Sequence, residues 1–106
     1  MDVGAFVMDA GGVRWADDLG MQDYHSLESK GIKLWGKTQD SERWNVFRLG
    51  TSSHNVLQVD GQQQRVDGHA PLVLSRDGRT IVDLTPVYAG QLATARRGVA
   101  LEADRS

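Results

Sequence analysis

Small or apolar residues alternate with polar ones over the first part of the chain. The stretch "VGAFVMD" (residues 3–9) follows this pattern, "AGG" supplies turn glycines, and "VRWADDL" (13–19) resumes it. Alternation with a period of two on both sides of a glycine-rich turn is typical of a β-hairpin. We therefore predict a hairpin within residues 3–19.

The pattern is lost between Gly20 and Ser41. This segment has no clean period of 3.6 or 2, and Gly31 and Gly36 interrupt any helix longer than two or three turns. We expect a long loop with one helical turn near Tyr24–Lys30. Loops of this length in compact domains are usually functional or disordered.

Strand-like patterns return in the second half of the chain. They cover residues 43–50, 54–61 with a turn at Asp60–Gly61, and 70–88 with a turn at Asp77–Gly78. Residues 90–104 could add one or two strands. Six to eight short strands separated by turns predict an all-β fold, an antiparallel β-sandwich. Because an unpaired sheet edge can accept another strand, the chain could also form a homo-oligomer through it.

Composition narrows the function classes. The chain has 106 residues, 40% hydrophobic and 25% charged, which suits one globular domain of modest core. It contains no cysteine, so disulfides, thiolate metal sites and cysteine nucleophiles are excluded. The net charge of −2 argues against a nucleic-acid binder, and no apolar run is long enough to cross a membrane. The N-terminus lacks the basic region of a signal peptide, and the absence of cysteine is compatible with periplasm or cytoplasm.

Basic residues are locally in excess between Lys30 and Arg48. Two acidic residues accompany five basic ones there: Asp40 and Glu42 against Lys30, Lys33, Lys37, Arg43 and Arg48. Such a run either attracts an acidic ligand or is simply a solvated surface, and the pattern alone leaves both open.

A histidine and a carboxylate are the candidate metal ligands. His54 stands where a loop is expected to become a strand, and Asp17 and Asp18 close the first hairpin. Since side chains alternate along a strand, one of the two carboxylates can face a pocket while the other is solvated. An imidazole and a carboxylate form part of a nitrogen–oxygen site suited to zinc. The alternative is that His54 bonds only to local backbone; His25 and His69 are expected on the surface.

Aromatic residues offer a second kind of chemistry. Trp15 and Trp44 are expected in the core, whereas Trp35 lies between Lys33 and Lys37 and is the best candidate for an exposed ring. Rings next to polar loops can stack on sugars. The sequence has no phosphate loop, nucleophile elbow or HExxH helix.

The segments "DVGAFVMDAGGVRWADDLG" (2–20) and "RWNVFRLGTSSHNVLQVDGQQQ" (43–64) resemble the C-terminal region of heparinase II/III-type polysaccharide lyases. The family has an HxDxGxF-like start, a hairpin that ends in Asp-x-Gly, and an Arg followed by a His-Asn pair. The resemblance extends over residues 2–75, and 76–106 match more loosely. The matching residues are Asp2, Gly4, Phe6, Asp18, Gly20, Arg48, His54 and Asn55.

The resemblance implies that residues 1–106 are part of a larger β-sandwich, truncated at both ends, which normally packs on an α/α-toroid. Such proteins cleave acidic, uronic-acid-containing polysaccharides by β-elimination. Of the family's three zinc ligands, the last two map onto Asp18 and His54. The first, the histidine of the HxD start, would fall just before Met1 and has no counterpart in this chain, so the zinc site is expected to be incomplete here. Most proton transfer is expected on the toroid, so the isolated chain is expected to be inactive. The parent is expected to be periplasmic or secreted, with the cytoplasm as the alternative.

Substrate contacts are predicted at Arg48, Asn55, Trp35 and Tyr24, with Asn55 also bracing His54. Two other functions remain open at this point. The chain could be a non-catalytic carbohydrate-binding module that uses Trp35, Tyr24, Lys33 and Lys37. It could also be a structural sandwich without metal, in which case Asp18 and His54 would lie more than about 6 Å apart.

Overall fold

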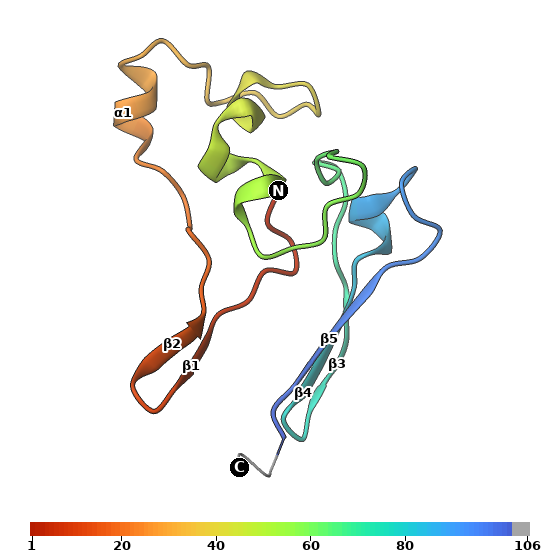
Figure 1. Ribbon diagram of the computed structural model, residues 1–106. Helices are drawn as coiled ribbons and strands as arrows, with labels where there is room; N and C mark the ends of the chain where they lie inside the picture. The colour runs from red at the N-terminus through yellow and green to blue at the C-terminus, as the bar shows by residue number, and fades with distance from the viewer. Residues whose placement is uncertain (103–106) are drawn as a thin grey trace.

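The computed structural model describes residues 1–102, and most of its regular structure is in two antiparallel sheets (Figure 1). The first sheet contains β1 (Met8–Ala10) and β2 (Val13–Ala16). The second has the order β3 (Leu72–Arg76), β4 (Arg79–Asp83), β5 (Arg96–Ala100). The helical segments are short: α1 (Tyr24–Glu28) and the 3₁₀ turns η1 (Glu42–Asn45), η2 (Phe47–Leu49), η3 (Thr51–Ser53) and η4 (Thr85–Tyr88). The all-β prediction is confirmed, and the architecture is consistent with a fragment of a β-sandwich.

The first predicted hairpin is confirmed, with shorter strands than expected. Asp9 pairs with Arg14 and Ala10 with Val13, and the register shifts between Met8 and Asp9. Every residue of β1 is exposed. The hairpin therefore depends on pairing and on contacts at its base rather than on a buried face.

The second sheet contains the clearest predicted hairpin, between β3 and β4. At its turn Asp77 has φ 51° and Gly78 has φ 71°. Two successive left-handed residues make the type I′ turn, whose twist matches that of the flanking strands, and this explains the Asp-Gly pair. The stretch 90–104 supplies β5, which pairs with β4 over its whole length; residues 103 and 104 lie outside the described residues.

Two predicted strands are wrong. Residues 43–50 form η1 and η2, and residues 54–61 contain only an isolated bridge between Val59 and Gln62, around the predicted Asp60–Gly61 turn. Packing explains the first error, because Trp44, Val46 and Leu49 all contact the same cluster. An extended strand would send Leu49 to the opposite face from the other two. The described residues consequently contain five strands instead of six to eight.

The buried apolar residues form two small clusters. Leu27, Leu34 and Leu49 form one, and the helical turn predicted near Tyr24–Lys30 contributes to it as α1. Leu84, Val87 and Tyr88 form the other, on η4. Trp44 packs against the first cluster and is partly buried. The prediction for Trp15 is wrong: its side chain is 67% exposed, on a hairpin without a covering layer.

The chain is elongated, with the two sheets together at one end and the helical turns at the other (Figure 1). Its extents are 50 × 36 × 22 Å and its radius of gyration is 15.9 Å. A compact domain of this length has a radius of gyration of about 13 Å. Large apolar side chains remain exposed as a result, among them Val7, Val13, Leu72, Val73 and Leu101.

Polar side chains join the N-terminal segment to the rest of the chain. Gln64 is 1% exposed; its Oε1 accepts from the Val3 amide (3.0 Å) and its Nε2 donates to the Val3 carbonyl (2.9 Å). Nη1 of Arg97, on β5, donates to the carbonyls of Gly4 (2.9 Å) and Asn55 (2.6 Å). Within residues 1–102, no helix has the length and apolar character needed to cross a membrane.

Candidate functional site

Asp18 and His54 meet although 36 residues separate them in sequence. Nδ1 of His54 lies 2.9 Å from Oδ1 and 3.0 Å from Oδ2 of Asp18. The side chains are 5% exposed for His54 and 15% exposed for Asp18. The predicted convergence of these two groups is confirmed, and this pair is the centre of the candidate site.

A tight turn after β2 positions Asp18. Gly20 has φ 62°, a conformation that glycine adopts without strain, and its amide donates to Oδ1 of Asp18 (2.9 Å). Asp17 faces away: its side chain is 63% exposed and contacts Arg14 at 3.4 Å. The two adjacent carboxylates thus have different surroundings, as the alternation of side chains predicts.

The Asp18 carboxyl is held in its ionised form. Burial alone would raise its pKa, but the hydrogen bonds from the Gly20 amide and His54 outweigh burial, and the pKa lies below its usual value. Asp18 therefore offers carboxylate oxygens at neutral pH.

His54 ends a 3₁₀ turn rather than beginning a strand. It follows η3, its backbone is extended (φ −105°, ψ 155°), and its amide donates to the Thr51 carbonyl (3.2 Å). Thr51 is 1% exposed, and its hydroxyl accepts from the Gln64 amide (3.0 Å). The imidazole therefore follows a turn that is anchored by its buried residue Thr51.

Asn55 is bound to backbone on both sides of the candidate site. Its Oδ1 accepts from the Phe6 amide (3.0 Å), and its Nδ2 donates to the carbonyls of Phe6 (2.6 Å) and Asp17 (2.9 Å). These contacts support the bracing role, since they join the neighbour of His54 to the neighbour of Asp18. A substrate contact by Asn55 stays a prediction.

A cavity of about 340 Å³ lies beside His54. Arg48, predicted to contact substrate, is exposed at its rim, and Tyr24 also contributes. The lining residues are Met1, Asp2, Met21, Tyr24, Arg43, Trp44, Arg48, Leu49 and His54.

Arg43 was seen in the sequence only as part of a basic run. Its guanidinium carbon lies 4.5 Å from the centre of the Trp44 ring, and its Nη2 donates to the Tyr24 hydroxyl (3.4 Å). Its Nε is buried and has no hydrogen-bond partner within residues 1–102. No spacing in the sequence signals this role; the sequence shows only that Arg43 and Trp44 are adjacent.

Tyr24, which is partly buried, and Trp35, which is exposed, form an aromatic pair. Their ring centres are 5.6 Å apart at 85°, and the indole nitrogen of Trp35 donates to Glu28 (2.7 Å). Trp35 is 67% exposed, which confirms the predicted exposure. Two of the predicted substrate-binding residues are therefore in contact.

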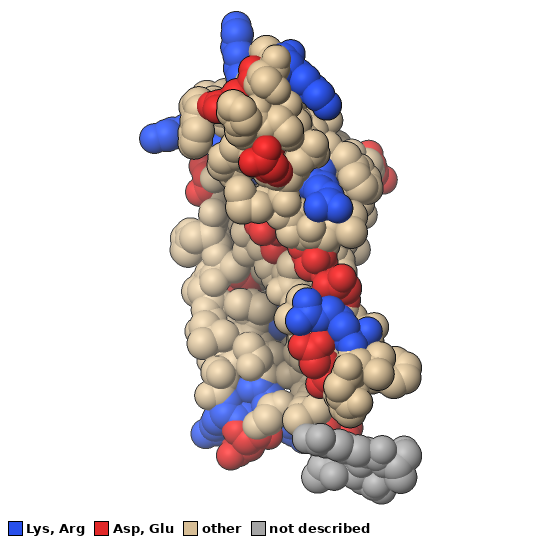
Figure 2. Space-filling view, turned by 90° about the vertical axis from the view of Figure 1, so that its left-hand side faces the viewer, with Lys and Arg blue, Asp and Glu red and all other residues tan. Residues whose placement is uncertain are grey.

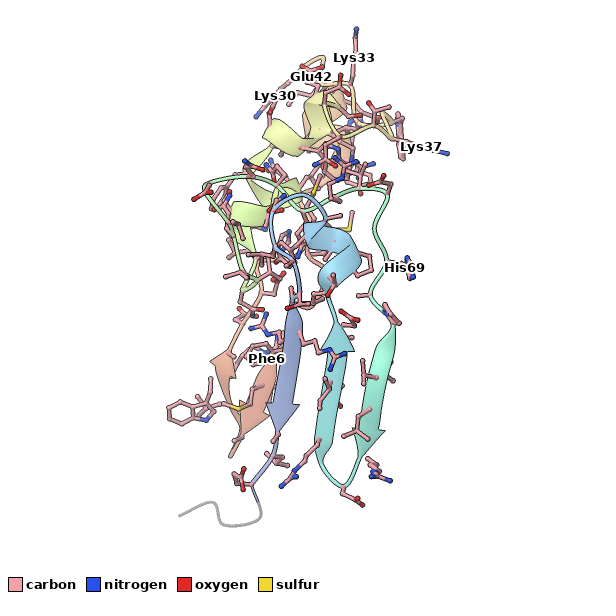
Figure 3. The ribbon with its side chains drawn as sticks, turned by 90° about the vertical axis from the view of Figure 1, so that its right-hand side faces the viewer. Phe6, Lys30, Lys33, Lys37, Glu42 and His69 are labelled. Carbon is pink, nitrogen blue, oxygen red and sulfur yellow. The ribbon has the colours of Figure 1, made fainter. Side chains whose placement is uncertain are left out.

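The basic run itself is a mixed surface. Lys30, Lys33 and Lys37 project from the helical end of the molecule, with Glu42 among them (Figure 3). Lys and Arg are interspersed with Asp and Glu over the face that carries α1 and the first hairpin (Figure 2). This arrangement agrees with the solvated-surface interpretation for the lysines, and leaves Arg43 and Arg48 as the basic residues of the 340 Å³ cavity.

A family model described as "Heparinase II/III-like, C-terminal" matches residues 1–106, the whole chain. The chain belongs to this family. The resemblance drawn from residues 2–75 is thereby confirmed and extended. A search of curated proteins gives no match. Family membership identifies the chain as a C-terminal domain of the heparinase II/III-like polysaccharide lyases.

In the heparinase II/III-like domain, the candidate site contains two side chains of donor types that zinc can take. Zinc usually takes three or four protein ligands, whereas residues 1–102 contain no group of three or more His, Asp or Glu side chains placed to share an ion. His25 and His69 are exposed, as predicted, and His69 projects away from the molecule (Figure 3). Asp18 and His54 therefore fit a zinc site in donor type but provide only part of its coordination.

Proposed function

We propose that this chain is the C-terminal domain of a polysaccharide lyase that cleaves uronic-acid-containing glycans by β-elimination, and that it contributes to a zinc site and part of the cleft. In this reaction a base removes the proton at C5 of the uronate, the C4–O bond breaks as a C4=C5 double bond forms, and an acid protonates the departing oxygen. The family assigns most of this proton transfer to the toroid. The role of the domain is then to position the site and contact substrate.

The contact between Asp18 and His54 is the observation that carries the proposal. An ionised carboxylate and an imidazole, brought together from distant parts of the chain, are suited to zinc. Met1 and Asp2 line the same cavity as His54. A histidine placed just before Met1, as the resemblance implies, would therefore start close to the pair and could complete the ligand set. A bound zinc would add a fixed positive charge beside the cleft.

Zinc content of the full-length protein tests the proposal. We expect about one zinc per chain in the wild type, and loss of most of it in His54→Ala and in Asp18→Asn. His69→Ala, which removes an exposed histidine, is the matched control and should keep its zinc. Retention of zinc by both His54→Ala and Asp18→Asn would contradict the metal role. Formation of the unsaturated uronate product, followed by its absorbance, tests the reaction separately.

A second candidate function is carbohydrate binding without catalysis. The Tyr24–Trp35 pair supports it, because the exposed Trp35 ring, held edge-to-face by the partly buried Tyr24, offers an apolar surface to a sugar ring. Trp35→Ala should then abolish glycan binding and leave zinc content unchanged. Trp15→Ala is a close control, since both rings are 67% exposed and Trp15 lies on the first hairpin. Equal loss of binding in the two variants would rule out a specific sugar site at Trp35.

The remaining expectations concern binding partners and cellular location. The exposed apolar residues of both sheets support packing against the toroid or further strands of the parent, and self-association through a sheet edge stays a prediction. A periplasmic or secreted location also stays a prediction, with the cytoplasm as the alternative. The metal-free structural sandwich predicted a wide separation of Asp18 and His54, and their 2.9 Å contact argues against it.

A further inference from the structure

Arg43 has unused hydrogen-bonding capacity in a partly enclosed position. A guanidinium has five N–H donors. One of them reaches the Tyr24 hydroxyl at 3.4 Å, and the buried Nε has no partner within residues 1–102. Arg43 also forms no ion pair with an acidic side chain of that part of the protein. A partly buried cation without an acceptor is unfavourable unless a ligand supplies one.

Stacking on Trp44 leaves in-plane N–H donors of Arg43 able to bind a ligand. Its guanidinium carbon lies 4.5 Å from the Trp44 ring centre, so one face of the group is occupied by the indole. The N–H donors lie in the plane of the group, along its edges, and stacking does not consume them. Because Nε is buried, the donors that a ligand can reach are those of the terminal nitrogens, Nη1 and Nη2. Two parallel donors at such an edge match the two oxygens of a carboxylate.

The cavity around Arg43 has a positive lining. Arg43 and Arg48 contribute two cations, and the acidic lining residue, Asp2, is exposed. A second cavity of about 360 Å³ shares Met1, Arg43 and Trp44 with the first and adds Lys37 and Arg65 to the lining. Arg43 therefore borders both spaces, and an anionic group can approach it from either.

We propose that Arg43, held by stacking on Trp44 and assisted by Arg48, binds a carboxylate of the acidic glycan in the cavity beside His54. This inference rests on the proposed function and names the group on the substrate that the domain recognises. Neither arginine has a hydrogen bond or ion pair to Asp18 or His54 in the described part of the chain. Carboxylate recognition by the arginines can thus be tested independently of Asp18 and His54.

The experiment measures binding by the full-length protein with isothermal titration calorimetry. The probes are an alginate tetrasaccharide, which carries one carboxylate per sugar, and the same tetrasaccharide with its carboxyls reduced to alcohols. The variants are Arg43→Gln, Arg48→Gln and, as the matched control, Arg14→Gln, whose guanidinium pairs with Asp9 on the first hairpin. Circular dichroism verifies that each variant is folded, and zinc content is measured alongside as a separate readout of the lyase proposal.

We expect the wild type to prefer the acidic tetrasaccharide. Arg43→Gln should weaken its binding about tenfold or more, the size expected for a charge-assisted hydrogen bond, and should leave binding of the reduced form unchanged. Arg48→Gln should give a smaller loss of the same kind, and Arg14→Gln a change below about twofold. Arg43→Lys should restore only part of the affinity, because an ammonium lacks the planar pair of donors.

Three results would overturn the inference: no binding of the acidic tetrasaccharide by the wild type, equal binding of both probes, or equal effects of Arg43→Gln on both. If Arg43→Gln does not fold, Arg48→Gln decides by the same criteria, since its side chain is exposed. Charge-dependent binding without zinc or unsaturated product would support the inference and contradict the lyase proposal. Zinc-dependent product formation with no effect of either arginine substitution on binding would support the lyase proposal and contradict the inference.

Discussion

Side-chain amides replace much of the backbone pairing that the middle of the chain lacks. Gln64 bonds both backbone groups of Val3, and Gln63 joins the Thr51 amide to the Trp44 carbonyl. Asn55 does the same for Phe6 and extends to Asp17. Because an amide side chain both donates and accepts, it can satisfy a peptide group as a neighbouring strand would. The candidate site is therefore organised by these amides.

Asn55→Ala should reveal this contribution. It removes three hydrogen bonds to backbone, and at about 1 kcal/mol each the free energy of unfolding should fall by about 3 kcal/mol. Urea denaturation measures it. Asn45→Ala is the control, because Asn45 is exposed on η1 and forms no side-chain hydrogen bond within residues 1–102. Similar losses in the two variants would mean that Asn55 does not act as a brace.

The Asp18 carboxyl should make stability depend on acid pH. Burial raises its pKa, but hydrogen bonds from Gly20 and His54 leave it below the ordinary value near 3.8 in the folded state. The unfolded chain therefore binds the proton at higher pH, and the stabilisation is complete above about pH 4 and lost as pH falls through the lowered pKa. Unfolding of wild type and Asp18→Asn between about pH 6 and pH 2 should show a difference that shrinks on acidification. Asp60→Asn, at an exposed turn, should show no such trend.

The two hairpins could be predicted from the sequence, because the residues at their turns determine the turn type. Asp77–Gly78 located the β3–β4 hairpin, and the glycine turn at residues 11 and 12 located β1–β2, because turn type is decided by adjacent residues. Residues 43–61 could not be predicted by alternation, since their conformation follows from packing on Leu27 and Leu34 and from bonds to Gln63 and Gln64. For the candidate site, the residues alone suggested His54 with one of Asp17 and Asp18, and the family resemblance selected Asp18. Arg43 was missed because its role depends on stacking and on an absent acceptor, which no spacing displays.

Glycine substitutions can test the turn that defines the second sheet. Gly78→Ala places a Cβ on a residue with φ 71°, only 3.4 Å from the Leu101 carbonyl oxygen, and should cost about 1–2 kcal/mol of unfolding free energy. Gly98→Ala, within β5, meets only ordinary contact with Ile81 at 3.8 Å and should be neutral or slightly stabilising. Thermal or urea unfolding of both variants measures the contrast. Equal effects would show that the left-handed turn conformation is not what requires glycine there.

At the scale of the whole molecule, the two sheets lie side by side (Figure 1), and contacts from β5 reach the segment that precedes β1. Phe6 lies next to β5 in Figure 3, and the guanidinium carbon of Arg97 is 4.7 Å from the Phe6 ring centre. Arg97 also donates to the Gly4 and Asn55 carbonyls. One side chain of β5 thus contacts both the segment before β1 and the residue that follows His54. Removing the Arg97 guanidinium should therefore destabilise the first hairpin and leave the pairing of the second sheet intact.

Hydrogen exchange can separate these two effects in Arg97→Met. Methionine keeps an apolar stem against Phe6 but donates no hydrogen bond, so the amides of residues 5–18 should exchange at least about tenfold faster, which corresponds to about 1.4 kcal/mol of local opening free energy. Amides of β3 and β4 should keep their protection, because their pairing is independent of Arg97. Arg96→Met, at the exposed neighbour on the same strand, should change neither region. Uniform acceleration across both sheets would mean that they unfold as one unit, and unchanged exchange in residues 5–18 would mean that Asn55 and Gln64 hold the hairpin without Arg97.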